Sequence, residues 1–382
     1  MPMRRIVVFC LSLILAIGLE AQGVYTCYDF NVPRVNAPAP KGYTAFYISH
    51  YGRHGARYIY SENEYTVLKE VFSKASLTPF GEQIRTKFDS LYPLLKGKAG
   101  KLSPLGKEQQ RVLAVRMLED WTKVFSRCCS VDAVSSDVPR CVHSMDSFLN
   151  SLRENRKLRK VAGQVDVSLL PVLKNGPIVR KNIDSLFLAR FDVDALYSRF
   201  FKDVTSAKSL AEPSFFIQSL YYFSVHLPSA GMAEEPVIAQ SFSKKELEIL
   251  SRLDDEKFNF HGGWSKPINV ARIWPLLENF VEEADIAVSS GKRQVRLRFG
   301  HDNTLIPFMT LLRMEPFSEH IFRSSDCPMG ANVRWIFAKN RKGDVLVKVQ
   351  YNESDVSSWM PWEEFKNDCL DKIAWAKQEL KI

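Results

Sequence analysis

Strand-forming segments occur near both ends of this 382-residue chain, and a long helical stretch separates them. Residues 43–50 (YTAFYISH) are aromatic and β-branched and predict a buried strand, and residues 293–299 (RQVRLRF) predict another. Two more strands are predicted at 333–338 and 345–350, joined by a turn that contains Gly343. Because strands from both ends can share one sheet, this distribution predicts an α/β fold that a helical insertion interrupts.

Helical periodicity accounts for most of the remaining chain. Ser103 and Pro104 fit the N-cap and first position of a helix that runs to about residue 125. The other predicted elements are helices at 63–74, 79–96, 146–158, 183–203, 211–225, 244–257 and 363–380, and a short strand at 130–136. Residues 165–285 carry few strand signals. We therefore predict a core formed by residues 22–164 and 286–382, with residues 165–285 inserted as a helical cap.

The N-terminus has the pattern of a secretory signal. Arg4 and Arg5 precede an apolar run from Ile6 to Leu19, which is shorter than the about 20 residues that a membrane span needs. We predict a cleaved signal at 1–21 and an exported protein, periplasmic or extracellular, without a stable membrane span after cleavage. The alternative is an uncleaved anchor, because Leu19 and the residue after it fit a cleavage site poorly.

Composition and charge narrow the function. Hydrophobic residues make up 46% and charged residues 25% of the chain, which excludes collagen, coiled coil and wholesale disorder. The net charge is +9, from 52 Lys and Arg against 43 Asp and Glu. Such a surplus indicates affinity for anions, and nucleic acid, an anionic membrane surface and phosphorylated small molecules all fit it.

Cysteine usage fits export and gives no sign of a metal site. Cleavage of the signal would remove Cys10 and leave six cysteines, an even number that permits disulfides without choosing among the pairings: Cys27, Cys128, Cys129, Cys141, Cys327 and Cys369. The sequence has neither a CxxC nor an HExxH motif, so we expect no metal and no cofactor.

The first candidate site follows the first strand. Arg53, His54, Gly55 and Arg57 lie in the loop after this strand, and the carboxyl ends of strands in α/β sheets commonly carry ligand sites. Guanidinium groups bind phosphate oxygens, and a histidine between two cations is held neutral and can act as a nucleophile. Gly55 would let the main chain approach a ligand closely. The alternative is a basic surface loop with an incidental histidine.

Two further segments repeat this arrangement. The strand at 293–299 leads to His301 and Asp302, and a carboxylic acid beside a cationic pocket can protonate a leaving oxygen. A buried helix is predicted over 305–314, so capping of that helix would also explain Asp302. Arg140 follows the short strand at 130–136 and could reach the same crevice, although alone it would be interpreted as a solvated surface arginine.

Together these segments resemble the histidine acid phosphatases, the branch of the histidine phosphatase superfamily that includes phytases and multiple inositol polyphosphate phosphatases. The resemblance covers most of the predicted mature chain, and its five elements occur in the family's order. They are YISHYGRHGARY, KLSPLGKEQQ, VSSDVPRCVHSMDSFL, RLRFGHDNT, and VKVQYNE followed by WMPWEEF. The resemblance implies a three-layer α/β core with a mixed, mostly parallel central sheet, as in phosphoglycerate mutase, and an inserted helical cap.

The resemblance also implies a role for each candidate residue. His54 would attack phosphorus and form a phosphohistidine, and Asp302 would protonate the leaving alcohol. Arg53, Arg57, Arg140 and His301 would hold the phosphoryl oxygens. Two departures stand out. Many members have a proline two residues after the second motif arginine, where this chain has Ile59, and the His-Ala-Glu element common in the inositol polyphosphate enzymes is here His-Asp-Asn-Thr. The opening motif is nevertheless closer to exported bacterial relatives of those enzymes.

These observations predict an exported, metal-independent phosphomonoesterase. Its expected partner is a small phosphorylated substrate, either an inositol polyphosphate or another phosphate ester such as a sugar phosphate. We do not expect it to bind nucleic acid. A non-catalytic phosphate-binding protein remains an alternative, but binding alone would need neither His54 nor Asp302. Weaker candidates are His50, which could support His54 or be a strand residue that faces the core, and His143, which could line the pocket or cap a turn. The pair Arg180 and Lys181 could contact outer phosphates or form a solvated helix start. A phosphomutase is disfavoured by export and by Asp302.

Overall fold

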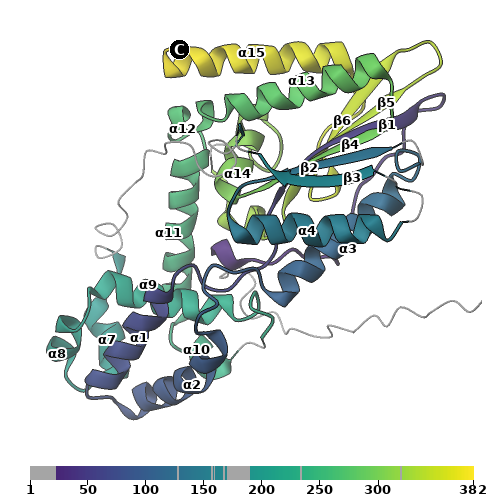
Figure 1. Cartoon of the computed structure of the whole chain (residues 1–382). Coiled ribbons are helices and arrows are strands. Elements are labelled where there is room, and N and C mark those ends of the chain that lie inside the picture. The colour runs from purple at the N-terminus through teal and green to yellow at the C-terminus, as the bar shows by residue number, and fades with distance from the viewer. Residues whose placement is uncertain are drawn as a thin grey trace, which may run out of the picture.

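The computed structural model describes residues 23–126, 129–155, 158, 160–166, 168–169, 190–232, 235–318 and 321–382. The predicted signal at 1–21, Cys128, Arg180 and Lys181 lie outside these residues. The described chain forms one sheet covered by helices on both faces, and a group of helices lies beyond one end of the sheet (Figure 1). Among the described helices, none combines the length and the apolar character that crossing a bilayer requires.

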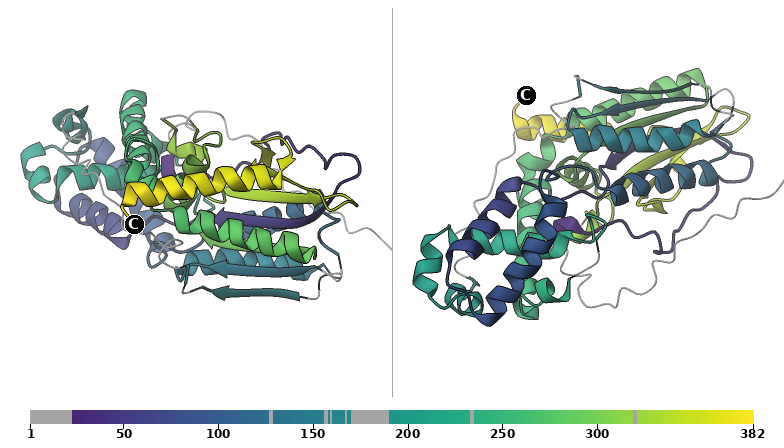
Figure 2. Two further views of the ribbon diagram at one scale, coloured as in Figure 1. Left: turned by 90° about the horizontal axis from the view of Figure 1, so that it is seen from above. Right: turned by 60° about the horizontal axis from the view of Figure 1, so that its bottom comes forward.

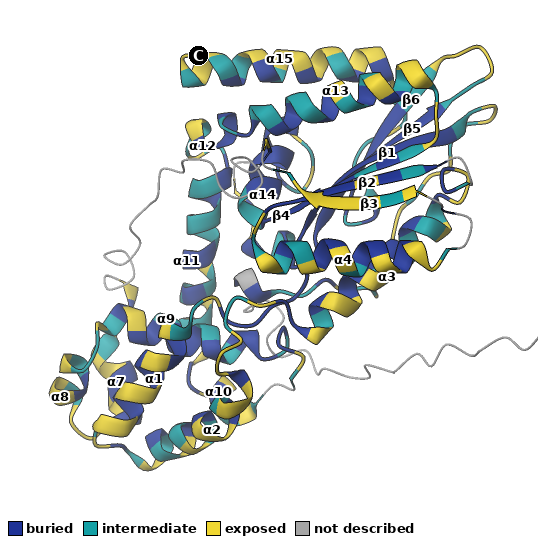
Figure 3. Ribbon diagram, in the orientation of Figure 1, coloured by how far each residue is buried: buried dark blue, intermediate teal, exposed yellow. Residues whose placement is uncertain are grey.

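The sheet is mixed, as predicted. Its strand order is β3 (Lys160–Val165), β2 (Ser130–Ser135), β4 (Gln294–Gly300), β1 (Thr44–Arg53), β5 (Asn332–Lys339), β6 (Val345–Tyr351) and β7 (Ser354–Asp355), and β8 (Met360–Pro361) also pairs with β6. The strands from β3 to β1 are parallel, and the pairs from β1 to β8 are antiparallel. The prediction missed β3, an edge strand exposed along most of its length (Figure 3). Its side chains therefore carry no alternating apolar pattern.

Strand β1 occupies the middle of the sheet. It is buried from its second residue onward and pairs with β4 on one side and β5 on the other. The register places Arg53 opposite Gly300, so the loops that follow β1 and β4 leave the sheet at the same level. The sequence placed Arg53 in the loop after this strand, but the ladder includes it, and its N–H donates to the Ala331 carbonyl at 2.8 Å.

Two helical layers cover the sheet, which gives the predicted three-layer core (Figure 2). One face carries α3 (Pro104–Asp120) and α4 (Pro139–Arg153), and the other carries α13 (Trp274–Ser290), α14 (Asp302–Leu312) and α15 (Trp362–Leu380). Side chains of β1 alternate between these layers. Ile48 packs in the cluster under α3 and α4, whereas Tyr47 and Tyr51 pack in the cluster that includes α13 and α14.

The remaining helices form a unit beyond the carboxyl ends of the parallel strands (Figure 1). They are α1 (Glu62–Lys74), α2 (Pro79–Leu95), α7 (Val193–Phe200), α8 (Val204–Ser209), α9 (Pro213–His226) and α10 (Pro236–Ala239), and α11 (Lys244–Gly262) and α12 (Pro267–Ala271) connect them to the core. Phe72, Phe88, Phe200 and Phe216 share the apolar cluster of this helical unit. The predicted division at residues 165 and 285 remains a prediction, but α1 and α2 pack in this unit and α13 packs on the sheet.

Two helices begin earlier than predicted, and both differences affect candidate residues. Helix α4 starts at Pro139 and not at residue 146, because proline suits the first position of a helix. Helix α14 starts at Asp302 and not at residue 305, with His301 as its N-cap. Arg140 and Asp302 therefore lie in the first turns of helices, where main-chain N–H groups also favour an anion.

A close main-chain contact joins the loop after β1 to the start of α3. A Cβ atom on Gly55 would lie 2.3 Å from the Gly106 carbonyl oxygen, and a Cβ atom on Gly106 would lie 2.1 Å from the Ala56 carbonyl oxygen. The N-cap Ser103 reinforces the contact, because its hydroxyl accepts from the Gly106 N–H at 3.2 Å and donates to the Ala56 carbonyl at 3.1 Å. A glycine is thus required at position 55 for this contact with α3. The sequence had instead suggested that Gly55 lets the main chain approach a ligand.

Replacing Gly106 tests the importance of this contact. We expect Gly106→Ala to lower the free energy of unfolding by about 1–3 kcal/mol, because the added Cβ meets main-chain atoms that cannot move aside alone. Chemical denaturation would measure the change. The exposed neighbour Lys107 provides the control, and Lys107→Ala should stay within about 0.5 kcal/mol of the unchanged chain. Equal effects of the two substitutions would contradict the prediction.

Candidate active site

The predicted site residues converge at the carboxyl edge of the sheet. Arg53 ends β1 and Gly300 ends β4, and the His54 N–H donates to the Gly300 carbonyl at 3.0 Å. Because β2 ends beside β4, it delivers α4 and Arg140 to the same edge. The structure thus brings together all six predicted residues, which come from three separate stretches of the chain.

His54 is held as a neutral imidazole with one defined tautomer. The residue is 2% exposed, and Nδ1 lies 2.8 Å from the carbonyl oxygen of Gly55. Since a carbonyl oxygen can only accept, Nδ1 carries the proton and Nε2 keeps its lone pair. Burial, and then the charges of Arg140 and Arg53, hold the pKa of His54 well below its ordinary value. The arrangement gives His54 an unprotonated nitrogen that can act as a nucleophile.

Arg53 is the most deeply buried of the three arginines in the site. Its guanidinium Nη2 lies 2.7 Å from Oδ2 of Asp302, and Nη1 donates to the carbonyl oxygen of Cys327. The carbonyl oxygen of Arg53 accepts from Nε2 of Gln110, in α3, at 3.3 Å. These contacts fix the guanidinium and link it to the start of α14.

Arg57 and Arg140 complete the positive side of the site. The Arg57 guanidinium carbon lies 4.9 Å from the ring centre of Tyr25 and 5.5 Å from that of Tyr60. Nη2 of Arg140 lies 3.3 Å from Nδ1 of His301. Within the described residues, the Nε atoms of both arginines are buried without a hydrogen-bond partner. Buried donors of this kind usually have an acceptor, so these two atoms indicate a place for an anion.

His301 is also neutral, and its protonated nitrogen follows from its contact with Arg140. Because guanidinium groups only donate, Nδ1 of His301 accepts and Nε2 carries the proton. Burial and the charge of Arg140 lower the pKa of His301 to about 3, although Asp302 acts in the opposite direction. The centre of its ring lies 5.5 Å from that of His54. His301 can therefore donate a hydrogen bond beside the His54 nucleophile.

The Asp302 carboxylate balances part of this positive charge. Its side chain keeps 19% of its surface exposed. Burial acts to raise the pKa of Asp302, but the positive charge of Arg53 opposes it most strongly, and the resulting pKa lies below the ordinary value. Asp302 also accepts from the N–H of Asn303 at 2.7 Å. The carboxylate is thus ionised in the unliganded site.

The structure places both weaker histidine candidates, and His50 is a core-facing residue of β1, which was one of its two interpretations. His50 is buried between the rings of Phe148 and Phe299, and His143 is exposed on α4. Sequence reasoning missed Tyr25, which stacks on Arg57, and gave Cys141 no role although it directly follows Arg140. Its Sγ lies 3.5 Å from Nε2 of His301.

Neither a disulfide nor a group of metal-ligating side chains occurs among the described residues. All five described cysteines are free thiols, namely Cys27, Cys129, Cys141, Cys327 and Cys369, so no disulfide joins any two of them. Over the same part of the chain, no three histidine, cysteine or carboxylate side chains form a group that could hold a metal ion.

The protonation states of the two histidines can be tested by NMR. In the unliganded protein at pH 5 we expect the imidazoles of His54 and His301 to be neutral, because both pKa values lie below the ordinary 6.5. Adding inorganic phosphate should shift His301 toward its protonated form, because a nearby anion favours the cation. Nitrogen-15 chemical shifts of the two rings would measure both effects. Imidazolium shifts at pH 5 without phosphate would contradict the prediction.

Comparisons with known proteins identify the fold. No protein-family model and no curated protein matches the sequence. A structure of Bifidobacterium longum multiple inositol polyphosphate phosphatase with phosphate matches with a TM-score of 0.74 at 16% identity, over 93% of this chain and 98% of that one. The phytase of D. castellii matches with a TM-score of 0.68 at 13% identity, over 94% of this chain and 85% of that one. The phytase of Hafnia alvei matches with a TM-score of 0.55 at 13% identity, over 89% of this chain and 99% of that one. The chain therefore has the fold of the histidine acid phosphatases, which confirms the fold predicted from its motifs.

Proposed function

We propose that this protein is an exported phosphomonoesterase that acts through a covalent phosphohistidine on inositol polyphosphates or other small phosphate esters. One observation carries the proposal: the unprotonated Nε2 of a neutral His54 lies among three guanidinium groups, two of which have buried donors without a described partner. A nucleophile surrounded by fixed positive charge suits attack on a phosphoryl group.

In the first step, the lone pair of His54 Nε2 attacks phosphorus. The bond between phosphorus and the leaving oxygen breaks, and Asp302 supplies the proton that this oxygen needs. Arg53, Arg57 and Arg140 balance the charge on the phosphoryl oxygens, and the Nε2–H of His301 donates to one of them. These side chains provide positive charge in fixed positions, so the proposed step requires no metal ion.

In the second step, water attacks the phosphohistidine. The Asp302 carboxylate accepts a proton from the water, the bond between phosphorus and Nε2 breaks, and inorganic phosphate is released. Asp302 thus acts as an acid in one step and as a base in the next. His54 returns to its neutral form with the same nitrogen unprotonated.

The ionisation of Asp302 predicts a preference for acidic conditions. Its pKa is below the ordinary value in the unliganded site, so the carboxyl group is charged near neutral pH. A bound phosphate brings negative charge close to it, which raises its pKa. The protonated fraction still decreases as the pH rises above that pKa. We therefore propose that esters with poor leaving groups are hydrolysed best at acidic pH.

Two observations support the proposed substrates and compartment. The structurally similar Bifidobacterium longum enzyme is known in complexes with phosphate and with inositol hexasulfate. The basic residues and apolar run at the N-terminus support export.

The helical unit lies beyond the strand ends that carry the site, where it would select the alcohol part of the substrate (Figure 1). Sugar phosphates, or a broad range of esters, are alternative substrates of the same site.

Replacing His54 tests the catalytic proposal. His54→Ala should reduce hydrolysis of p-nitrophenyl phosphate and of inositol hexakisphosphate by at least about 10³-fold, because the attacking nitrogen is lost. His143→Ala, at the exposed histidine of α4, is the control and should retain activity. Equal rates for His54→Ala and the unchanged protein would contradict the proposal. A non-catalytic phosphate-binding protein would instead bind phosphate and hydrolyse neither substrate.

The role of Asp302 predicts a dependence on the leaving group. Asp302→Asn should reduce hydrolysis of inositol hexakisphosphate more than hydrolysis of p-nitrophenyl phosphate, because nitrophenolate departs without a proton. Comparison of kcat for the two substrates on the same variant measures this difference and provides its own control for folding. Equal losses on both substrates would exclude Asp302 as the proton donor.

A further inference from the structure

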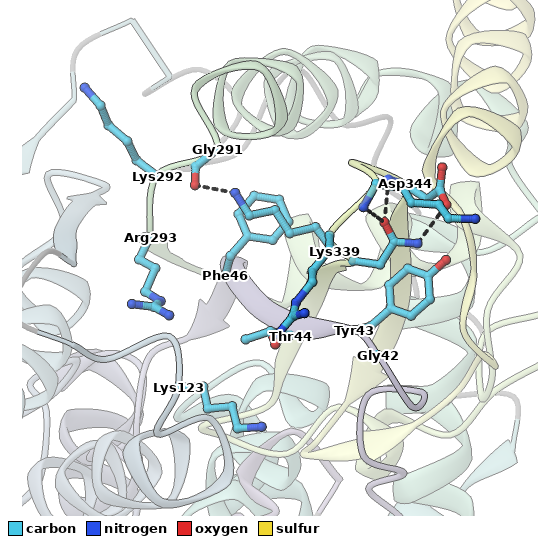
Figure 4. Close-up of a pocket in the computed structure, with 13 residues that line it drawn as sticks. Gly42, Tyr43, Thr44, Phe46, Lys123, Gly291, Lys292, Arg293, Lys339 and Asp344 are labelled. Carbon is cyan, nitrogen blue, oxygen red and sulfur yellow. Dashed lines mark hydrogen bonds between the residues drawn. The ribbon is translucent and has the colours of Figure 1, made fainter.

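A second group of cationic side chains lines a cleft at the other end of the sheet (Figure 4). The cleft has a volume of about 1080 Å³, and thirteen residues line it. Six of them are cationic and define what we call the basic cleft: Lys123, Lys292, Arg293, Lys339, Arg341 and Lys342. Asp344 is the one carboxylate among the thirteen. This concentration of positive charge does not belong to the candidate active site.

Strand β1 separates the two sites. Thr44 lines the basic cleft and begins the ten-residue strand that ends at Arg53 in the candidate active site. At about 3.3 Å per residue, the two ends lie about 30 Å apart. A small ligand therefore cannot contact both sites at once.

Four segments build the basic cleft, and a hydrogen bond holds two of them together. The segments are the start of β1, the stretch after α3, the connection from α13 to β4, and the turn from β5 to β6. Nζ of Lys339 donates to the Gly291 carbonyl at 2.6 Å and lies 4.8 Å from the ring centre of Phe46 (Figure 4). The β5–β6 turn is therefore fixed to the end of α13.

The β5–β6 turn is itself ordered by one side chain. Oδ1 of Asn340 accepts from the N–H groups of Lys342 at 2.9 Å and Asp344 at 3.0 Å. Nδ2 of Asn340 donates to the Asp344 carboxylate at 2.7 Å. The carboxylate of the cleft thus interacts with an amide of its own turn, while the neighbouring Lys342 stays exposed.

Among the described residues, no carboxylate forms an ion pair with any of the six cations, although surface pairs such as Arg34 with Asp120 and Lys366 with Asp285 occur elsewhere. Cations gathered in a concave site repel one another and raise the local concentration of anions. The basic cleft therefore has positive charge available for a ligand.

We propose that the basic cleft binds a compact ligand that carries several phosphate groups. Its volume is close to that of typical small-ligand sites, about 300–1,000 Å³, and cations from several segments can reach separate phosphates of one ligand. The residues that line it include no histidine or cysteine, so the proposal concerns binding without catalysis. The same chemistry is presented by a free inositol polyphosphate and by a phosphoinositide headgroup. This binding does not depend on the proposed hydrolysis.

The test counts ligands bound to a chain that cannot hydrolyse them. We expect calorimetric titration of His54→Ala with inositol hexakisphosphate to show two sites. Adding Lys292→Gln, Arg341→Gln and Lys342→Gln should weaken one site at least about tenfold, because three exposed cations are lost. The control carries Lys74→Gln, Lys202→Gln and Lys245→Gln, which remove the same charge from exposed positions on the helical unit and beside it. It should keep both sites.

The outcomes separate this proposal from the proposed function. Equal binding by the cleft variant and the control would overturn the cleft proposal. Loss of a site in the cleft variant alone would support it, whether or not the unchanged protein hydrolyses the ligand. Sedimentation with phosphatidylcholine vesicles, with and without phosphatidylinositol 4,5-bisphosphate, distinguishes a lipid-borne ligand from a free one. If the basic cleft bound a short DNA duplex more tightly than inositol hexakisphosphate, the proposal of a compact ligand would be overturned.

Discussion

Parallel pairing of β1 with β4 is the constraint on which the candidate active site depends. Residues 53 and 300 are opposite one another, so the two loops that carry His54, His301 and Asp302 leave the sheet at the same level. The N–H of His54 continues this ladder by one more hydrogen bond to Gly300. A shift of one residue in this register would turn the side chains of β1 to the opposite face. The buried surfaces of both helical layers therefore also maintain the geometry of the site.

The electrostatics of the unliganded site indicate a structure organised for an anion. Three guanidinium groups and two neutral imidazoles lie around one carboxylate, and Arg53 is the arginine that pairs with this carboxylate. Burial and the charges of the neighbouring arginines lower the pKa of both histidines, so neither imidazole adds positive charge to the site. Because the donors are fixed before a ligand arrives, little reorganisation is needed when negative charge develops on a phosphoryl group.

Local sequence patterns predicted much of this structure. Apolar spacing placed α1 and α2 within one residue of their observed ends, and the two histidine motifs predicted a shared edge of the sheet. The features that the sequence did not predict depend on tertiary contacts. β3 is exposed and has no pattern to detect, and the stacking of Tyr25 on Arg57 joins residues distant in sequence. Helices α1 and α2 follow the core strand closely, yet their apolar faces pack against α7 and α9, which occur more than a hundred residues later.

The path of the chain around α1 and α2 has a mechanical consequence. The chain leaves the site at Arg57, forms both helices in the helical unit, and returns beside its starting point, where Arg57 and Leu102 form a β-bridge. The carbonyl oxygen of Arg57 also accepts from the hydroxyl of Ser229, beyond the end of α9. Arg53 and Arg140, in contrast, are anchored in the sheet and in α4. Any rotation of the helical unit relative to the sheet would therefore displace Arg57 first and leave the other two arginines in place.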